Sequence, residues 1–454
     1  MLSPAKEKLP ANETPGLLSA GHLAPAAIYR LSDFWQEPDW LRERRLAAGR
    51  IYDALPLPRW QRGIRGWWTI DISGLHLEQI APYALAGSPA PSDDRPLPRR
   101  RRKAEPHAGL LVQHDSAAVH QELDETLAAQ GVIFTDLGRA AREHPDLLRA
   151  HLGGLVRPEE DKFVALHTAL ASGGVLLYVP AGVTVALPLA ARFRLASPQT
   201  GMFVHTLLVA EAGSRVTYVE EYSSPPLDGQ GLHSGVVEVY AKEGAEVQFV
   251  TIHNWGESVF NFALKRAAVY RDARMRWVAG FLGSGLTKAA VETHLRERGA
   301  ELEAAGIFFG SGGQHLDLTS RTYHEAPHTH GDVLFKGVVK DAARSALEGL
   351  IRVEPGAQQT TSYLSNNTLQ LSREAKSDSI PSLEIEANDV RVSHGATVGM
   401  IDEEQLYYLM SRGLARRAAE RMIVGGFFEP VLKRVPLAGA RQELLDCIER
   451  KMGA

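Results

Sequence analysis

Apolar and polar residues alternate in short runs from about residue 172 to residue 395. Runs such as MFVHTLLVAEAGSRVTYVEEY are rich in valine, tyrosine and phenylalanine, and glycine or proline separates them, which is typical of β-strands. The fragments AEAGSRVTYV and AKEGAEVQFV repeat one turn-then-strand pattern, with Gly213 and Gly244 lying 31 residues apart. Recurring turns before short strands favour the stacked coils of a β-solenoid, although a two-sheet sandwich has a similar pattern. A Rossmann-type fold is disfavoured because long helices do not alternate with these strands.

Helical patterns flank this β-rich region on both sides. Residues 119–130 and 136–152 have the spacing of amphipathic helices, and Gly153 provides a stop signal for the second one. The pattern changes from helical to strand-like near residue 171, and back to helical after residue 398. We therefore divide the chain into a mostly helical region at 1–170, a β core at 171–398 and a C-terminal helical domain at 399–454.

The C-terminal domain opens with a clear helix signature. Asp402 can accept a hydrogen bond from an unpaired amide of the first turn while Gln405 reaches back, as in a capping box. Leu406 then begins an apolar face, and Gly413 stops the helix. A second helix is predicted to follow and to end at the pair Gly425–Gly426.

Composition and charge exclude several classes of protein. Of the 454 residues, 44% are hydrophobic and 23% are charged, and the net charge of −4 gives no overall attraction to nucleic acid or to an anionic membrane. No apolar run approaches the ~20 residues of a membrane span, and the N-terminal residues lack the apolar stretch of a secretory signal. The basic run Arg99–Lys103 belongs to a Pro- and Arg-rich loop at 88–107. We interpret that loop as flexible and solvated, because no aromatic residue interleaves with its charges.

The usual catalytic motifs are missing. A single cysteine, Cys447, cannot form an internal disulfide, which fits a reducing compartment, so we predict a cytoplasmic protein. This cysteine lies on a helical stripe, which favours a core residue over a nucleophile. The stretch GFLGSGLTK resembles a phosphate loop, but Leu286 stands where the lysine must follow. No dinucleotide-binding glycine pattern and no G-x-S-x-G elbow is present.

One segment, TYHEAPHTHGDVLFKG, concentrates histidines at positions His324, His328 and His330. Residues two apart on a strand point to the same side, so His328 and His330 would suit a metal ion. A cupin-type site would also want a carboxylate a few residues later, where the apolar triplet 333–335 stands. These histidines could instead cap strands or line a polar ridge, and the residues alone leave both alternatives open.

His394 in VRVSHGATVG is a second candidate. Val390 and Val392 alternate with polar residues, which places His394 on the same side of the strand as the valines. Gly395 then allows a close approach of the backbone. A lone histidine is more often structural than functional, so the pattern by itself does not assign a role.

The segment SNNTLQLSREAKSDSIPSLEIEANDVRVSHGATVGMIDEEQLYYLMSRGL closely resembles the SufB/SufD family of iron–sulfur cluster assembly proteins. The stretches YVPAGVTVALPL, VTIHNW, HEAPHTH and GFFEPVL agree, so the resemblance covers about residues 165–435. SufB-type chains carry cysteines in the β core, whereas this chain has none before Cys447. The resemblance is therefore closest to SufD-type chains, with Val392 where many of them have a cysteine.

This resemblance implies a right-handed parallel β-helix core and a non-enzymatic scaffold role. It implies edge-to-edge pairing with a SufB-type subunit through the β-helix, and docking of a SufC-type ABC ATPase on the C-terminal helices. The histidine that matches His394 is implied to face the SufB interface and to hold the nascent cluster or its iron. The implied ATPase-docking residues are Asp402, Glu403, Gln405, Leu406, Tyr408 and Arg412.

The expected cofactor is a transient iron–sulfur cluster, or iron, shared with the SufB-type partner, and none is expected to be tightly bound in the isolated chain. Imidazole is a suitable ligand for Fe(II) and can replace thiolate on a cluster. A solenoid with an open edge could also form a homodimer in isolation. Flavin binding is left open, and the alternative function is a β-rich, cupin-like metalloenzyme that uses His324, His328 and His330.

Overall fold

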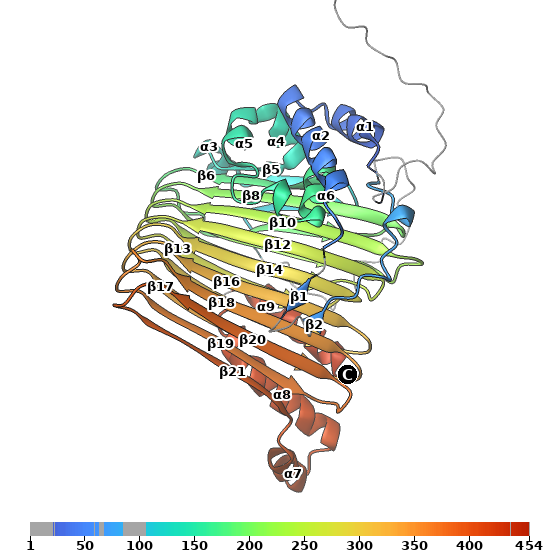
Figure 1. Cartoon of the computed structure of the whole chain (residues 1–454), viewed down its shortest axis with the longest axis vertical. Coiled ribbons are helices and arrows are strands. Elements are labelled where there is room, and N and C mark those ends of the chain that lie inside the picture. Colours follow the sequence, from blue (N-terminus) through green and yellow to red (C-terminus); the bar gives the residue numbers. More distant parts are fainter. Residues whose placement is uncertain are drawn as a thin grey trace, which may run out of the picture.

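The computed structural model describes residues 21, 23–58, 60–62, 68–84, 106–435 and 437–453. At its centre the chain winds through two long sheets in turn, so that each coil contributes one strand to each sheet (Figure 1). Neighbouring strands pair in parallel, as β10 (Gly231–Ala241) does with β12 (Val259–Val269). The predicted β-solenoid is therefore confirmed. The basic run Arg99–Lys103 lies outside the described residues.

Sheet I has nine strands in the order β5-β6-β8-β10-β12-β14-β16-β18-β20, and sheet II has ten in the order β4-β3-β7-β9-β11-β13-β15-β17-β19-β21. Within them only the pairs β5–β6 and β3–β4 are antiparallel. The remaining strands of sheet I are β5 (Ile133–Asp136), β6 (Gly173–Val179), β8 (Thr200–Ala210), β14 (Leu286–Leu295), β16 (His315–His324), β18 (Arg344–Val353) and β20 (Lys376–Ile385). Those of sheet II are β3 (Gly109–His114), β4 (Ala117–Leu123), β7 (Leu189–Arg194), β9 (Arg215–Ser223), β11 (Glu246–Asn254), β13 (Arg274–Phe281), β15 (Glu301–Gly310), β17 (His330–Val339), β19 (Thr361–Gln370) and β21 (Arg391–Met400). A separate short pair is formed by β1 (Gln61–Arg62) and β2 (Trp68–Thr69).

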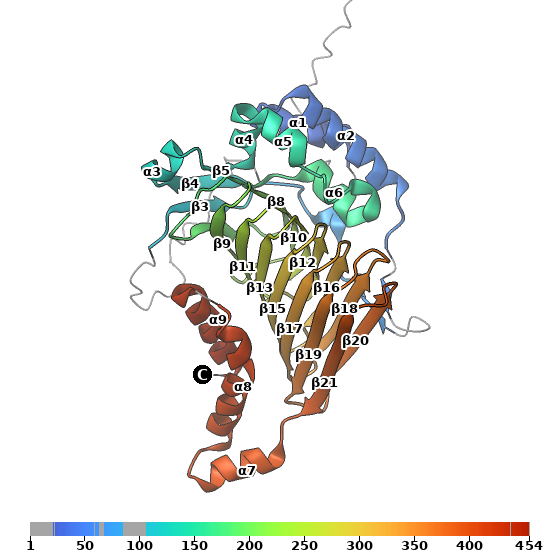
Figure 2. The ribbon, with the colours of Figure 1, turned by 90° about the vertical axis from the view of Figure 1, so that its left-hand side faces the viewer.

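Helices cover the N-terminal end of the solenoid and the outer face of sheet II. The N-terminal helices are α1 (Pro25–Trp35), α2 (Asp39–Ala54), α3 (Glu125–Ala129), α4 (Leu137–Glu143), α5 (Pro145–His151) and α6 (Lys162–Leu170), with short 3-10 turns at Leu77–Gln79 and Pro158–Glu160. The C-terminal helices are α7 (Glu403–Ser411), α8 (Arg416–Leu432) and α9 (Ala438–Lys451). Figure 2 shows α8 and α9 running back along sheet II, while α7 extends beyond the last strand. Phe428 and Leu444 join the apolar cluster that Val250 and Ile252 form on the outer face of that sheet.

Three helix predictions are corrected by the structure. Residues 119–123, the first part of the helix predicted over 119–130, belong to strand β4, because pairing with β3 overrides the local pattern. The helix predicted over 136–152 is divided at Pro145, which begins α5 as a first-turn proline. Gly425 and Gly426 lie inside α8 rather than at its end. The apolar face of α8 packs on sheet II, and that burial outweighs the roughly 1 kcal/mol that each glycine costs a helix.

The repeated glycines of the sequence mark one corner of the solenoid. Gly213 and Gly244 have φ values of 66° and 64°, a left-handed conformation that glycine adopts without strain. The Gly213 amide donates to the carbonyl of Glu243, and the Gly244 amide donates to that of Arg271, each at 2.8 Å. Each corner is thus tied to the corner of the next coil, and the 31-residue spacing is the length of one coil.

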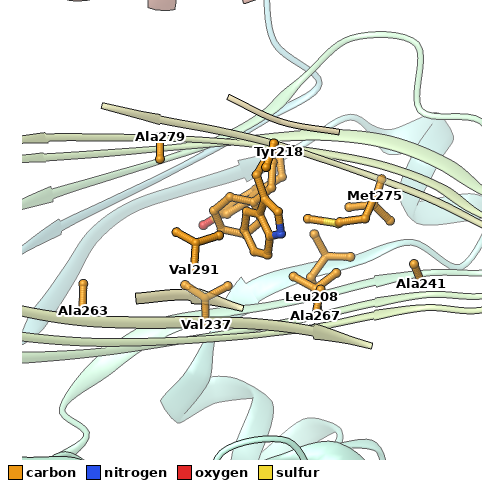
Figure 3. Packing of buried hydrophobic residues seen from close by; sticks show 14 of the residues in the cluster. Leu208, Tyr218, Val237, Ala241, Ala263, Ala267, Met275, Ala279 and Val291 are labelled. Atoms are coloured by element: carbon orange, nitrogen blue, oxygen red, sulfur yellow. The ribbon is translucent and has the colours of Figure 1, made fainter. Parts of the chain in front are cut away.

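Inside the solenoid, equivalent side chains of successive coils stack on one another. Figure 3 shows Tyr218 and Met275 of sheet II facing Val237 and Val291 of sheet I across the interior. Burying each large side chain contributes about 1.5–3 kcal/mol, so the columns supply much of the stability of the fold. One column, whose members are at most 2% exposed, consists of Leu189, Tyr218, Phe249, Trp277, Ala304, Val333 and Leu364.

A buried carboxylate ties the N-terminal helical region to the outer face of sheet I. Glu238 on β10 is fully buried and accepts hydrogen bonds from the amides of Gly153, Leu155 and Val156 at 2.5, 2.7 and 3.0 Å. The Nε2 atom of His205 lies 3.0 Å from the same carboxylate. Burial by itself raises the pKa of Glu238, but these partners outweigh it and the pKa lies below its usual value. The carboxylate therefore stays charged and fixes the loop after α5.

Replacing Glu238 by alanine is expected to lower the free energy of unfolding by about 3–5 kcal/mol, because three backbone amides and His205 lose their acceptor in a buried site. Chemical denaturation measures this change. Glu243→Ala, at an exposed corner, is the matched control and should change stability by no more than about 0.5 kcal/mol. A loss no larger than that of the control would contradict the role of Glu238.

Stability should fall as the pH drops below about 6.5. Burial lowers the pKa of His167 and His253 well below the usual value, and lowers that of His233 and His324 to about 3. The unfolded chain takes up protons at these four rings below about pH 6.5 while the folded chain does not, so acid favours unfolding. Each ring contributes up to about 1.4 kcal/mol per pH unit between pH 6.5 and its folded pKa. Denaturation curves at pH 7.5, 6 and 5 test this, and a stability that is flat over this range would contradict it.

Candidate functional site

The last coil of the solenoid ends in two unpaired strand edges. Strand β20 is the final strand of sheet I and pairs only with β18, while β21 is the final strand of sheet II and pairs only with β19. No other described strand continues either sheet. Half of the backbone amides and carbonyls along β20 and β21 therefore face outward, ready to pair with a strand of another chain.

His394 lies in the middle of β21 and ends an interior column. Its register partner on β19 is Leu364, the last buried member of the column that begins at Leu189. Val392 pairs with the buried Ser362, so the prediction that His394 shares a face with Val392 is confirmed. Because no further coil covers it, the imidazole of His394 is exposed. Strand β21 continues for six residues beyond His394, to Met400.

Exposed apolar side chains lie on the same two terminal strands as His394. Val398, Met400 and Ile385 are 40%, 49% and 41% exposed. In the earlier coils the equivalent side chains point into the solenoid and are covered by the next coil, so large apolar side chains exposed at these positions are unusual. The strand edges and these side chains together form what we call the open end, defined by residues 376–385 of β20 and 391–400 of β21. The open end therefore presents one exposed imidazole on strands that also carry exposed apolar side chains.

The structure gives the open end no thiolate of its own. Cys447 is buried on α9, within the apolar cluster on the far side of sheet II. Burial raises the pKa of its thiol to about 12, so it stays protonated at neutral pH. Among the described residues no group of three or more His, Cys, Asp or Glu side chains could hold a metal ion. A metal at His394 would therefore need ligands from another molecule.

Helix α7 stands next to the open end and is held by a small apolar cluster. Asp402 caps the helix by accepting hydrogen bonds from the amides of Glu404 and Gln405 at 2.9 and 3.4 Å. Leu406 is fully buried against Ile401 and Ala419, with Leu369 of β19 packed beside them. Helices α7 and α8 therefore contact the end of sheet II through this cluster.

Most of the predicted docking residues on α7 are exposed. Tyr408 is 57% exposed, and the Arg412 guanidinium lies 5.1 Å from the centre of its ring. Glu403 is also exposed and forms an ion pair with Arg416 at 2.9 Å. Leu406 is the exception, because its burial means that it supports the helix rather than contacting a partner. A hollow of about 420 Å³ lies on this helix, lined by Asp402, Glu404, Gln405, Tyr408, Leu409 and Ile423.

The histidines of residues 324–330 are divided between the interior and the surface. His324 points into the solenoid, where its Nδ1 lies 2.8 Å from the hydroxyl of Thr329. His328 occupies a solenoid corner with φ of 59°, the position that Gly213 and Gly244 hold in earlier coils, so it does not share a strand with His330. The prediction that His328 and His330 point the same way from one strand is therefore wrong. Nothing in this arrangement favours the cupin-like alternative.

The phosphate-loop-like glycines have packing roles instead. A Cβ atom at Gly280 would lie 2.6 Å from Leu444, so this glycine allows α9 to approach sheet II. A Cβ atom at Gly283 would lie 2.2 Å from the backbone of Trp255. In the described part of the chain, none of the helices has the length and hydrophobicity that crossing a membrane requires.

The fold defines a β-solenoid protein in which an exposed histidine, His394, lies on one of the two terminal strands, whose outer edges are unpaired among the described residues. Residues 193–427 match the family model described as SUF system FeS cluster assembly, SufBD core domain, and residues 108–190 match the SufBD protein N-terminal region. An iron–sulfur cluster assembly SufBD family protein of Staphylococcus epidermidis is 33% identical over 421 residues, which are 90% of this chain and 89% of the relative. Proteins with the same family description from Staphylococcus haemolyticus and Staphylococcus aureus are 32% identical over the same shares of the two chains. The chain belongs to the SufBD family of iron–sulfur cluster assembly proteins.

Proposed function

We propose that this chain is a SufD-type scaffold subunit that pairs with a SufB-type subunit through its open end. The observation that carries the proposal is His394, an exposed imidazole that ends an otherwise buried column between two unpaired strand edges. The absence of a cysteine from the β core supports a SufD-type rather than a SufB-type chain. A single buried cysteine also fits the reducing cytoplasm.

Pairing at the open end is supported by backbone and side-chain chemistry. A solenoid of similar width could add its own edge strands to β20 and β21, which would satisfy the outward backbone groups. The same contact would bury Val398, Met400 and Ile385. A second copy of this chain could use the same edges, but a homodimer would place only imidazole at the interface and no thiolate.

His394 would then supply one ligand to iron or to a nascent cluster at the subunit boundary. A neutral imidazole is a good donor to Fe(II), and thiolates from the partner would complete the set. A site shared by two chains loses its geometry when the chains move apart, which suits a cluster that is built and then passed on.

Helix α7 is proposed to receive the SufC-type ATPase. Its exposed residues and the hollow beside Tyr408 provide the contact surface, and the buried Leu406 cluster joins the helix to β19. Ile401, which links β21 to α7, donates its amide to the carbonyl of Gln370 on β19 at 3.1 Å. A movement of α7 driven by nucleotide would therefore act on β19 and on β21, the strand that sheet II contributes to the open end.

Replacing His394 by alanine should reduce cluster formation in the reconstituted three-protein complex by about tenfold or more, because a direct ligand is lost. Assembly of the complex, followed by size-exclusion chromatography, should be unchanged. Ser393→Ala, one residue away on the opposite face of β21, is the matched control. Cluster formation by His394→Ala at the rate of this control would rule out the ligand role.

Replacing Tyr408 by alanine should weaken binding of the ATPase subunit by about tenfold or more, since losing a central aromatic contact typically costs over ~1.4 kcal/mol. Lys433→Ala, an exposed change near the other end of α8, should leave the affinity unchanged. Isothermal titration of the purified subunits measures both values. Equal affinities for the two variants would place the ATPase elsewhere on the chain.

A further inference from the structure

Two chains of hydrogen bonds cross the interior of the solenoid near its N-terminal coils. In the first, Lys265 Nζ donates to Glu220 Oε1 at 2.6 Å, and the hydroxyl of Thr251 donates to the same oxygen at 3.1 Å. The Nε2 atom of His253 lies 3.2 Å from that hydroxyl. All four side chains are at most 2% exposed, so this chain of contacts lies wholly within the interior.

The second chain begins at another buried histidine. His233 Nδ1 lies 2.7 Å from Asn261 Oδ1, and the side-chain nitrogen Nδ2 of Asn261 donates to Thr287 Oγ1 at 3.1 Å. The hydroxyls of Thr287 and Ser284 lie 2.6 Å apart. All four side chains are fully buried.

From Ser284 the second chain continues to the surface of the C-terminal domain. The carbonyl of Ser284 accepts a hydrogen bond from Gln314 Nε2 at 2.6 Å. Gln314 Oε1 in turn accepts one at 2.5 Å from Lys451 in the last turn of α9. The second chain of contacts therefore runs from His233 in the solenoid interior to the end of α9.

The hydrogen bonds fix which nitrogen of each imidazole carries the proton. Asn261 Oδ1 can only accept, so His233 Nδ1 donates and His233 Nε2 is a lone pair. Thr251 uses its proton for Glu220, so it accepts from His253 Nε2, and His253 Nδ1 is a lone pair. Burial keeps both rings neutral, with the pKa of His233 lowered to about 3 and that of His253 well below its usual value.

Four polar atoms in this region have no hydrogen-bond partner among the described residues. They are the lone pairs of His233 Nε2 and His253 Nδ1, the indole N–H of Trp255 and the hydroxyl of Tyr222, whose ring stacks on His253. The His233 ring centre lies 4.8 Å from that of Trp255 and 5.8 Å from that of His253. An unpaired polar group in such an interior costs about 1–3 kcal/mol, so an occupant that pairs with the two imidazole nitrogens and the indole N–H is strongly favoured.

We propose that one water molecule binds between His233, His253 and Trp255 and joins the two chains into a single network from Lys265 to Lys451. The water donates one hydrogen to each imidazole and accepts the indole N–H, the three bonds that a buried water usually makes. A metal ion would satisfy the two imidazoles but has nothing to accept the N–H of Trp255. The network anchors the end of α9, and with it the C-terminal domain, to the interior. This inference does not depend on the proposed function.

A crystal structure of the full-length protein near 1.5 Å, with anomalous data, tests the occupant directly. We expect a single peak without anomalous signal, within about 3.2 Å of the two imidazole nitrogens and the indole nitrogen. An empty site would overturn the proposal, as would a peak with the anomalous signal of a transition metal.

Hydrogen–deuterium exchange tests the anchoring of α9. His253→Phe removes one ligand of the water while keeping an aromatic ring, and should speed exchange of the amides of residues 438–451 about fivefold. Phe281→Leu is the matched control, because the Phe281 ring stacks on His253 from sheet II but makes no hydrogen bond. Exchange in α9 that is equal in the two variants would show that the network does not reach the helix.

Discussion

The structure depends on parallel register, which places each residue of a coil directly over its counterpart in the coil before. Tyr218, Phe249 and Trp277 stack in this way, and each finds an apolar neighbour above and below. Such stacking gives every strand a hydrogen-bonding partner on both sides, except the first and the last strand of each sheet. The N-terminal end is closed by antiparallel β4 and β5 and by helices, whereas the C-terminal end remains open. The location of the candidate site follows from this difference between the two ends.

The regular part of this fold could be predicted from the sequence because one coil repeats its turn chemistry. Gly213 and Gly244 were enough to indicate stacked coils. Later coils place Asp272, His328 and Gln359 at left-handed positions, which hides the repeat from a search for glycine. Strand β4 and the uninterrupted helix α8 could not be predicted, because pairing with β3 and burial against sheet II decide them.

For the candidate site, the sequence supplied His394 and its face of the strand but not its exposure. The alternation of polar and apolar residues predicts that the His394 side chain is on the inward face of the strand. It is exposed because no further described coil covers that face, which the alternation does not indicate. The resemblance named Leu406 as a docking residue, although its spacing with Leu409 is that of a buried face. The interior network was missed for a different reason. His253 and Trp255 are two residues apart, but His233 lies on β10 of the opposite sheet, and only the turn of the coil between β10 and β11 brings it to them.

Because the corners of successive coils stack on one another, the number of coils fixes the length of the solenoid. Each coil advances the chain by the spacing of neighbouring strands, about 4.8 Å, while keeping every side chain in its column. Duplicating or deleting one coil would therefore move His394 along the axis by one such step. Helices α8 and α9 return along sheet II to Gly280 and Gln314, so their combined span must match the number of coils between those residues and the open end. Changes in coil number in this architecture are then constrained to occur together with compensating changes in the length of the C-terminal helices.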